Sequence, residues 1–404
     1  MPSIIVLSHE EQQKRLRRTC PEAIPNTLIA GDICFDRMRA SRPLRPTYRR
    51  ILGLRPAQRL IVITSTWGPH SLLATAPDLP RRLACALPAD EFRIMLAPHP
   101  NIRAQHSRWQ FAQYLADATR AGVHIPEDVD DWRAGLVACD LVVGDHSSVA
   151  FYGAALGRPL LLATTPSQTV DPDSPIAHML SAGNRLDPNG DLEEQIRRAC
   201  ADNSFERFAG IVDQTTSVPD QSPALLRAAM YHTLGLPEPV EAATATMLPA
   251  AAPLSSTGAA HIVAVTPHGD RKAAIVRYPA ERLNTGLPST AGTHLAVDLR
   301  QPDLALTGLA DLLIGTLGPD AREWIEGTLS EIPGCLVAAV PIAPGRWLIG
   351  DRRMLFEATG TDQACCRFAS IVTHNSDCDN ETLTGTWRID CADRTYTVTV
   401  TRTR

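Results

Sequence analysis

Residues 136–162 contain a short apolar strand, a polar turn, a compact helix and a second apolar strand in immediate succession. The predicted first strand is 141–143, the turn covers 144–146, and Ser147 is of a residue type that caps helix N-termini. Such a unit leaves backbone N–H groups and the hydroxyls of Ser147 and Ser148 at a helix N-terminus, where the helix dipole favours an anion. The segment therefore predicts a phosphate or nucleotide-diphosphate site.

Apolar runs alternate with helical patterns across residues 28–236, which is typical of a parallel sheet with crossover helices. We therefore predict an α/β domain with a Rossmann-like parallel sheet. Besides 141–143, strands are expected at 60–64, 92–96 and 123–125, and helices at 80–87, 106–121, 130–138, 192–201 and 223–234. In the helix at 106–121, the side chains expected to face the core are Trp109, Phe111, Tyr114 and Leu115.

The flanking segments differ in pattern from this domain. Residues 1–27 are predicted to be a short lead-in, and residues 237–260, rich in Pro, Ala and Thr, an extended linker. Residues 261–404 are predicted to form a smaller α+β domain of unknown role, with helices near 306–317 and 320–329. Its strand-like runs are 261–265, 274–277, 294–297, 347–350, 386–389 and 396–400.

Polar side chains follow three of the predicted strands. Because ligands bind at the carboxyl ends of strands in open parallel sheets, we expect these side chains to line one crevice. The candidate residues are Thr66, Trp67, His99, Asp145, His146, Ser147 and Ser148.

Each candidate also has an ordinary structural explanation. Ser147 could serve only as a helix cap. The ring of His99, held between two prolines, either donates to a phosphate oxygen, which we favour, or caps the turn. Asp145 orients His146, binds a ribose or base edge, or closes an Asx turn. Trp67 either stacks on a base or sugar or packs in the core.

Other kinds of site lack their motifs. GxGxxG, Walker, HExxH and GxSxG patterns are absent, so NAD, P-loop, zinc-protease and α/β-hydrolase sites have no support. Five potential zinc ligands near the C-terminus fit no paired CxxC spacing, and we predict neither a metal nor a cofactor. They are Cys365, Cys366, His374, Cys378 and Cys391.

The formal net charge of −5 argues against a nucleic-acid partner. Residues 14–59 nevertheless carry 12 Lys and Arg against three acidic residues. We favour a solvated helix face whose arginine stems cover apolar surface, and the alternative is attraction for an anionic polymer or membrane surface. Because no apolar run reaches the ~18 residues that span a bilayer, we expect a cytoplasmic protein, with peripheral attachment at the inner membrane face as the alternative.

Several short motifs follow one another over residues 28–200. They are Gly31-Asp32-x3-Asp36, Arg49-Arg50-x-Leu52-Gly53-Leu54, Thr66-Trp67, His99-Pro100 and Asp145-x-Ser147-Ser148. Their order resembles the C-terminal half of the CDP-glycerol glycerophosphotransferases, GT-B enzymes of teichoic-acid synthesis.

The resemblance implies a Rossmann-like domain that holds the CDP part of a donor. Ser147 and Ser148 would contact the diphosphate, His99 would assist catalysis at the phosphates, and Asp145 would lie by the nucleotide. A glycerol- or ribitol-phosphate unit would pass to a cell-envelope polymer when an acceptor hydroxyl attacks the phosphate and CMP departs.

The chain departs from that pattern at two places. His146 replaces the family's usual tyrosine, and only 27 residues precede the matched region, where GT-B enzymes have a whole acceptor domain with a catalytic base. We therefore expect either a shortened form of the enzyme or a binding module without catalysis. The rival predictions are a UDP-sugar glycosyltransferase or epimerase, and a nucleotide-sensing or scaffold protein whose last domain recruits a partner.

Overall fold

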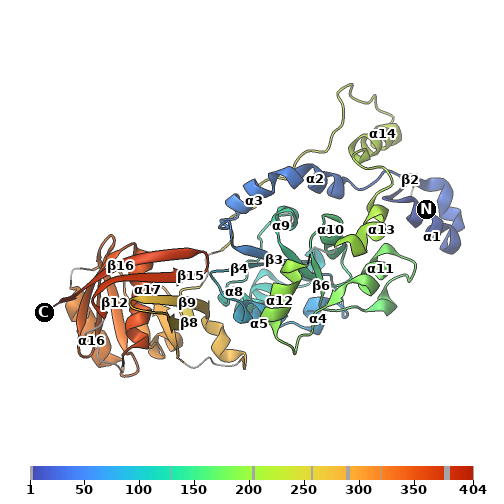
Figure 1. Cartoon of the computed structure of the whole chain (residues 1–404). Coiled ribbons are helices and arrows are strands. Elements are labelled where there is room, and N and C mark those ends of the chain that lie inside the picture. Colours follow the sequence, from blue (N-terminus) through green and yellow to red (C-terminus); the bar gives the residue numbers. More distant parts are fainter. Residues whose placement is uncertain are drawn as a thin grey trace. The chain divides into compact units, whose positions relative to one another are not determined.

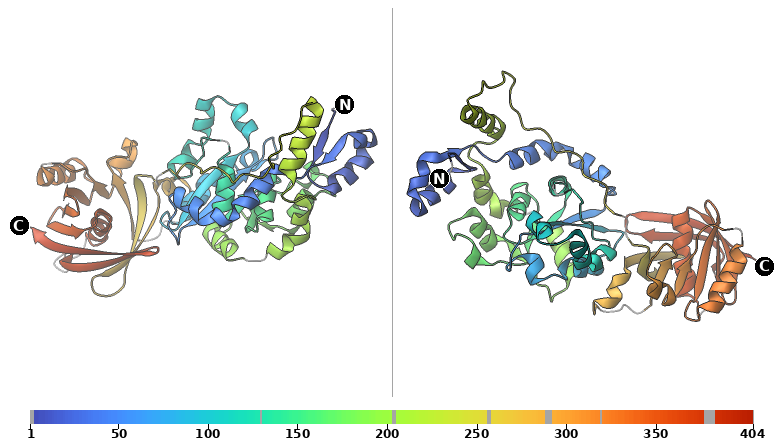
Figure 2. Two further views of the ribbon diagram at one scale, coloured as in Figure 1. Left: turned by 90° about the horizontal axis from the view of Figure 1, so that it is seen from above. Right: turned by 180° about the vertical axis from the view of Figure 1, so that it is seen from behind.

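The computed structural model describes residues 3–128, 130–202, 205–255, 258–287, 292–318, 320–376 and 383–403. They form two compact units, which Figures 1 and 2 show from three sides. Unit 1 comprises Met1–Pro80, Ile94–Leu115 and His124–Leu254, and unit 2 comprises Arg81–Arg93, Ala116–Val123 and Ser255–Arg404.

A five-stranded sheet forms the centre of unit 1 and has the Rossmann-like arrangement predicted from the sequence. The strand order is β4-β3-β5-β6-β7, and His124 extends the edge through a parallel bridge to Met95 of β4. When the six strands, with the His124 bridge counted as one, are numbered in chain order, their order across the sheet is 3-2-1-4-5-6. The order therefore reverses between β3 and β5. The strands are β3 (Arg59–Ser65), β4 (Phe92–Pro98), β5 (Leu141–Gly144), β6 (Leu160–Leu162) and β7 (Asn184–Arg185).

Helices α2, α3, α9 and α10 lie on one side of this sheet (Figure 1). The sequence patterns placed several helices within two residues of their observed ends, and α12 covers the predicted residues 192–201. The helices of unit 1 are α1 (Glu10–Thr19), α2 (Ile33–Ser41), α3 (Arg45–Ile51), α4 (Leu72–Thr75), α6 (Pro100–Ala104), α7 (Arg108–Tyr114), α9 (Trp132–Ala138), α10 (Ser148–Ala155), α11 (Pro175–Ala182), α12 (Leu192–Ala201), α13 (Ala209–Val212) and α14 (Ser222–Leu234).

The single helix predicted at 106–121 is wrong. A capping box at Ser107 starts α7, which ends at Tyr114, and a separate helix α8 (Ala116–Arg120) follows. Trp109 is 70% exposed, whereas Leu115 is buried. Phe111 and Leu115 are four residues apart and share a helix face, and Trp109 lies off that face.

Three stacked aromatic rings hold α10 in place. Tyr152 of α10 lies between Phe35 and Trp132, with centroid distances of 6.1 and 6.2 Å and interplanar angles of 12° on both sides. Gly153 lets α10 approach the sheet, because a Cβ at this position would lie 2.7 Å from Val142 of β5. The N-terminus of α10 is therefore fixed relative to the carboxyl end of β5.

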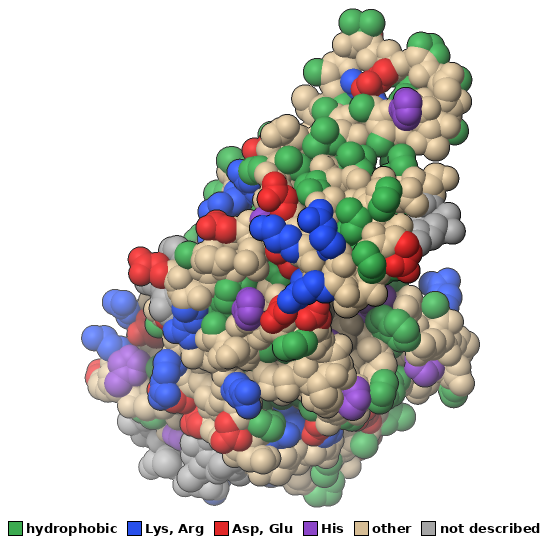
Figure 3. Space-filling model, turned by 90° about the vertical axis from the view of Figure 1, so that its right-hand side faces the viewer, with side chains coloured by type: hydrophobic (Ala, Val, Ile, Leu, Met, Phe, Trp, Pro, Cys, Tyr) green, Lys and Arg blue, Asp and Glu red, His purple; other side chains and the backbone are tan. Residues whose placement is uncertain are grey.

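The predicted linker is irregular but partly packed. Leu248, Ala251 and Leu254 are buried in the core of unit 1, and Tyr48 Oη donates to the carbonyl of Leu248 at 2.8 Å. By contrast, α14 buries only Ser222 among its 13 residues. Figure 3 shows hydrophobic side chains gathered at the upper end of the molecule, where Figure 1 places α14.

The predicted lead-in has structure of its own. Strands β1 (Ile5–Leu7) and β2 (Thr27–Ile29) pair in parallel, and α1 connects them together with a short 3-10 turn. Residues 5–29 therefore form a small strand–helix–strand unit.

Unit 2 is α+β, and nine strands close into a barrel within its described residues. The barrel order is β10-β11-β12-β13-β14-β16-β15-β9-β8. The strands are β8 (Ala260–Pro267), β9 (Lys272–Pro279), β10 (Thr293–Asp298), β11 (Leu312–Ile314), β12 (Val337–Ala343), β13 (Arg346–Asp351), β14 (Leu355–Gly360), β15 (Gly385–Cys391) and β16 (Arg394–Thr403). The helices assigned to this unit are α5 (Leu79–Ala86), α8, α15 (Leu304–Gly308), α16 (Ala321–Glu331) and α17 (Asp362–His374).

Helix α17 is the core of the barrel (Figure 1), and the sequence patterns missed it. It contacts β8 and every strand from β10 to β16, and Phe368 and Ala369 are fully buried. The helix predicted at 306–317 is also wrong, because Leu312–Ile314 forms strand β11 between β10 and β12.

Among the residues that the structure describes, no helix combines the length and apolar character needed to cross a bilayer.

Candidate functional site

Asp145 ties together the two strand ends at which the sheet changes direction. Its side chain is fully buried, and Oδ2 accepts the backbone N–H groups of Thr66 at 2.8 Å and Leu72 at 3.0 Å. Its Oδ1 accepts the N–H of Ser147 at 3.0 Å, which closes the Asx turn. Asp145 therefore shapes the loops after β3 and β5, and its carboxylate is occupied by backbone donors.

Ser147 and Ser148 differ in role although they are neighbours. Ser147 is buried and caps α10, since its hydroxyl accepts the N–H of Ala150 at 3.1 Å and lies 3.4 Å from Thr64 Oγ1. Ser148 is exposed. Within the described residues, the backbone N–H groups of Ser148 and Val149 donate to no protein acceptor. The first turn of α10 thus offers two N–H donors and one hydroxyl.

His99 and Trp67 stand together at the ends of β4 and β3. Their ring centroids are 6.2 Å apart, and the N–H of His99 donates to the carbonyl of Ser65 at 2.9 Å. His99 Nδ1 accepts the N–H of Asn101 at 3.1 Å and so caps α6, which was the alternative explanation for this residue. With Nδ1 as acceptor, the proton of the neutral ring lies on Nε2. Trp67 is 48% exposed and is not a core side chain.

Histidines at this edge are held in the neutral form. Burial lowers the pKa of His99, and nearby Asp145 only partly opposes it. Burial also lowers the pKa of His146, with His70 acting in the same direction against Asp145. The Nδ1 atom of His146 is buried and lacks a hydrogen-bond partner among the described residues. The predicted site residues therefore include two neutral imidazoles, His99 and His146, at the same edge of the sheet as the first turn of α10.

A small cavity of about 150 Å³ lies beside Ser148, and we call it the serine cavity. Arg15 of α1 lines it and is held by Glu11 at 2.7 Å and Asp171 at 2.9 Å. Ser174 caps α11 at the same cavity by accepting the N–H of Ala177. Two helix N-termini and one guanidinium thus line a single hollow. The remaining polar lining residues are Ser8, Glu11, Gln12, Asp32, Tyr152, Gln214 and Thr215.

Arg15 and Ser174 were not among the site residues predicted from the sequence. Ser174 could have been recognised, because Ser followed by Pro is a common start of a helix. Arg15 lies in the basic segment 14–59, but nothing in the sequence distinguished it from the other arginines there, since α1 reaches the cavity only through the tertiary structure. None of the residues lining the cavity comes from β3 or β4, so Trp67 and His99 are not part of it.

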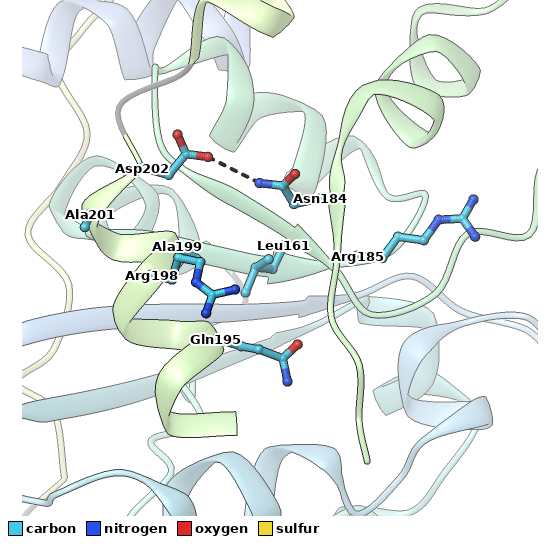
Figure 4. A pocket seen from close by; sticks show the side chains of 8 residues that line it. All are labelled: Leu161, Asn184, Arg185, Gln195, Arg198, Ala199, Ala201 and Asp202. Carbon is cyan, nitrogen blue, oxygen red and sulfur yellow. Dashed lines mark hydrogen bonds between the residues drawn. The ribbon is translucent and has the colours of Figure 1, made fainter. Parts of the chain in front are cut away.

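A larger cavity of about 620 Å³ lies at the β7 edge of the sheet (Figure 4). It is lined by α12, β6 and β7, where Asn184 donates to Asp202 at 3.2 Å and Arg198 is paired with Glu194. It contains none of the predicted site residues and lies away from the point where the strand order reverses.

Many arginines of the basic segment 14–59 are engaged within unit 1. Arg45 and Arg49 pair with Asp140 at 2.6 and 2.8 Å, and Arg37 donates to the carbonyls of Thr246 and Met247. These contacts agree with a structural role for this segment.

The cysteine cluster at the C-terminus is spread over the barrel. Cys365 and Cys366 belong to α17, Cys391 to β15, and Cys378 lies outside the described residues. Among the described residues, no group of three or more His, Cys, Asp or Glu is placed to hold a metal ion.

Comparison with known proteins gives structural neighbours only. No family model matches the sequence, and no curated protein matches it. The wall teichoic acid polymerase TagF aligns with 57% of this chain and 57% of its own, at 14% identity and a TM-score of 0.40. WaaG, a glycosyltransferase of lipopolysaccharide biosynthesis, aligns with 55% of this chain and 61% of its own, at 16% identity and a TM-score of 0.34. Anabaena HepE in complex with UDP and glucose aligns with 58% of this chain and 63% of its own, at 14% identity and a TM-score of 0.32.

This chain thus spans less than two thirds of the length of each of these neighbours. At such identities and TM-scores, a function for this protein depends on the residues of its own site.

Proposed function

We propose that unit 1 binds a nucleotide-diphosphate donor and acts as a transferase. The observation that carries the proposal is the N-terminus of α10, which lies where the strand order reverses and has two backbone N–H groups without a protein acceptor. Phosphate binds well at such a terminus, because its N–H groups and dipole both stabilise negative charge.

Arg15 and Ser148 support this choice of ligand. Arg15 and the exposed Ser148 both line the serine cavity, and the start of α11 adds a second helix dipole. We assign the diphosphate to the first turn of α10. Trp67 is assigned to stacking on the base or sugar, because about half of its ring is exposed beside His99.

The donor that fits the sequence motifs is CDP-glycerol or CDP-ribitol. An acceptor hydroxyl would attack the phosphorus that bears the polyol and form the new P–O bond, the bond from that phosphorus to the bridging oxygen would break, CMP would leave with the electron pair, and the hydroxyl proton would pass to solvent water. His99 is assigned as a hydrogen-bond donor to a phosphate oxygen, because its neutral ring carries the proton on Nε2. Oriented donors of this kind stabilise the charge that develops on the leaving group.

Two rival functions use the same site. A UDP-sugar glycosyltransferase would bind uridine nucleotides better than cytidine nucleotides, and a catalytically inactive module would bind nucleotide without releasing CMP or UDP. The acceptor in the leading proposal is an anionic cell-envelope polymer.

The deciding experiment is thermal unfolding of the full chain with CDP-glycerol, CDP, UDP-N-acetylglucosamine or UDP. A ligand at about 100 times its Kd stabilises the folded protein by about 2.7 kcal/mol. CDP-glycerol is expected to give the largest shift, and release of CMP in the presence of acceptor would separate an enzyme from a binding module.

Ser148→Asp tests the location of the site. A carboxylate in the first helical turn favours the helix dipole but repels a diphosphate, so the protein should stay folded and lose its response to nucleotide. Ala224→Asp adds the same charge to the first turn of α14 and should leave that response unchanged. An unaltered nucleotide shift in Ser148→Asp would place the ligand elsewhere, and no shift with any nucleotide would refute the donor site.

A further inference from the structure

A second cavity, of about 220 Å³, lies within unit 2 and takes no part in the proposed transfer. We call it the arginine cavity. It is lined from strands β8 to β11 and from α17, and its polar lining residues are His261, Arg277, Asp298, Arg300, Arg367 and Ser370. The apolar side chains of Val263, Ala296 and Ile314 complete the wall.

Two of these arginines share one carboxylate. Arg277 makes a two-point contact with Asp90, with Nε to Oδ2 at 2.8 Å and Nη2 to Oδ1 at 2.9 Å. Arg367 reaches the same Oδ1 only at 3.4 Å. Asp90 is buried, and these two guanidiniums hold its pKa far below the usual value despite the opposing effect of burial. Asp90 is therefore ionised, and its charge is matched chiefly by Arg277.

Arg367 is the underpaired cation. The residue is 6% exposed, its Nε is buried without a hydrogen-bond partner among the described residues, and Nη1 donates to the carbonyl of Gln363. Its guanidinium stacks on the ring of Tyr396 with the carbon 4.4 Å from the centroid. The charge is thus buried and rigidly held.

The other groups around the cavity do not supply the missing negative charge. Asp298 is paired with Arg300 through both oxygens, at 2.9 and 2.6 Å. Burial, with Arg277 acting in the same direction, lowers the pKa of His261 to about 3, so its ring is neutral at pH 7. Burial likewise raises the pKa of Cys366, which keeps that residue as a thiol. Three arginines, Arg277, Arg300 and Arg367, are therefore balanced by only two carboxylates, those of Asp90 and Asp298.

We propose that the arginine cavity binds a small oxyanion, a phosphate or a carboxylate, which supplies this charge. A buried charge without a counter-ion is unfavourable, and a planar guanidinium matches both kinds of oxyanion. The volume far exceeds the roughly 10–15 Å³ that one water needs and is below the roughly 300 Å³ of pockets for drug-sized ligands. The ligand is therefore small, with a short apolar part against Val263 and Ile314.

The test is calorimetric titration of the full chain with inorganic phosphate and, separately, with acetate, each against chloride at equal ionic strength. The titration is made in the Ser148→Asp background, where phosphate binding at α10 is expected to be lost, and a remaining signal is assigned to unit 2 where Arg367→Met removes it. Preference for phosphate would identify a phosphoryl ligand, and preference for acetate a carboxylate.

Arg367→Met should weaken binding by about tenfold or more, while Arg277 and Asp90 remain a balanced pair. Ala296→Leu fills part of the cavity without changing any charge, so it should also weaken binding if Arg367→Met fails to fold. Arg346→Met removes an exposed barrel arginine that pairs with Glu357, and it should bind as the parent does. Binding as strong as that of the parent in both Arg367→Met and Ala296→Leu would overturn the proposal, as would the absence of binding by both anions.

Discussion

The buried carboxylate of Asp145 accepts the backbone N–H of Thr66 at 2.8 Å, which joins the loop after β5 to the loop after β3. The two loops belong to adjacent strands at the point where the strand order reverses. This contact makes Asp145 a positioning residue for the first turn of α10.

Asp145→Asn is expected to destabilise unit 1 by about 2–3 kcal/mol, because an amide nitrogen would replace one of two oxygens that accept buried N–H groups. Urea unfolding would measure the loss. Asp187→Asn changes an exposed carboxylate that, among the described residues, accepts only the N–H of Asn189 in an Asx turn, and it should cost far less. Equal losses in the two variants would contradict the role given to Asp145.

Trp67→Ala is expected to weaken nucleotide binding with little effect on stability, because the ring is 48% exposed. Loss of a stacking contact is worth about 1–3 kcal/mol, or roughly 5- to 150-fold in Kd. Trp109→Ala removes a ring that is 70% exposed on α7 and serves as the control. Equal Kd values for both variants and the parent would remove Trp67 from the site.

The stability of unit 2 should fall in mild acid. Burial lowers the pKa of His261 to about 3 and that of His294 to about 4, from a normal value of 6.5. Between pH 6.5 and 4 the unfolded chain binds protons that the folded chain does not. The free energy of unfolding should therefore decrease as pH falls through this range, by up to about 1.4 kcal/mol per pH unit for each histidine.

His294→Leu should reduce that pH dependence. Both ring nitrogens of His294 are buried without hydrogen-bond partners among the described residues, so an apolar side chain should also raise the melting temperature at pH 5. His268→Leu alters an exposed histidine of the same unit and is the matched control. The same acid sensitivity in His294→Leu and the parent would refute this account.

Leu248→Ala should destabilise unit 1 by about 2–4 kcal/mol, since the side chain is 6% exposed in the core. The adjacent Met247 is 56% exposed, so Met247→Ala should change the free energy of unfolding by less than about 0.5 kcal/mol. Urea unfolding distinguishes a packed segment from a free linker, for which both substitutions would have little effect.

The sequence was sufficient for the central strands of the sheet and for the start of α10, because both depend on local signals, whereas the two-residue edge strand β7 was not predicted. The apolar runs at 60–64 and 141–143 are buried strands β3 and β5, and Ser147 caps the helix as its residue type predicts. The sequence could not show that Ser147 is buried and Ser148 exposed, because the Ser147 hydroxyl is buried against Thr64 of β3, which is distant in sequence.

Features formed by distant segments were not predictable in this way. Helix α17 is almost entirely buried, including Arg367, Ser370 and Thr373, so its polar side chains do not mark a solvent-facing side as they do in a surface amphipathic helix. The serine cavity and the arginine cavity each combine residues from separate elements, and Asp90 lies far in sequence from Arg277 and Arg367. Nothing local to these residues indicates that they meet.

The closeness of Gly153 to Val142 ties the body of α10 to the sheet behind the proposed diphosphate site. Even a methyl group at residue 153 would push α10 away from Val142. Because a short helix moves as a rigid body, its N-terminus would move as well. A larger side chain at residue 153 would thus move the first turn of α10, and with it the proposed diphosphate site, without contacting the ligand.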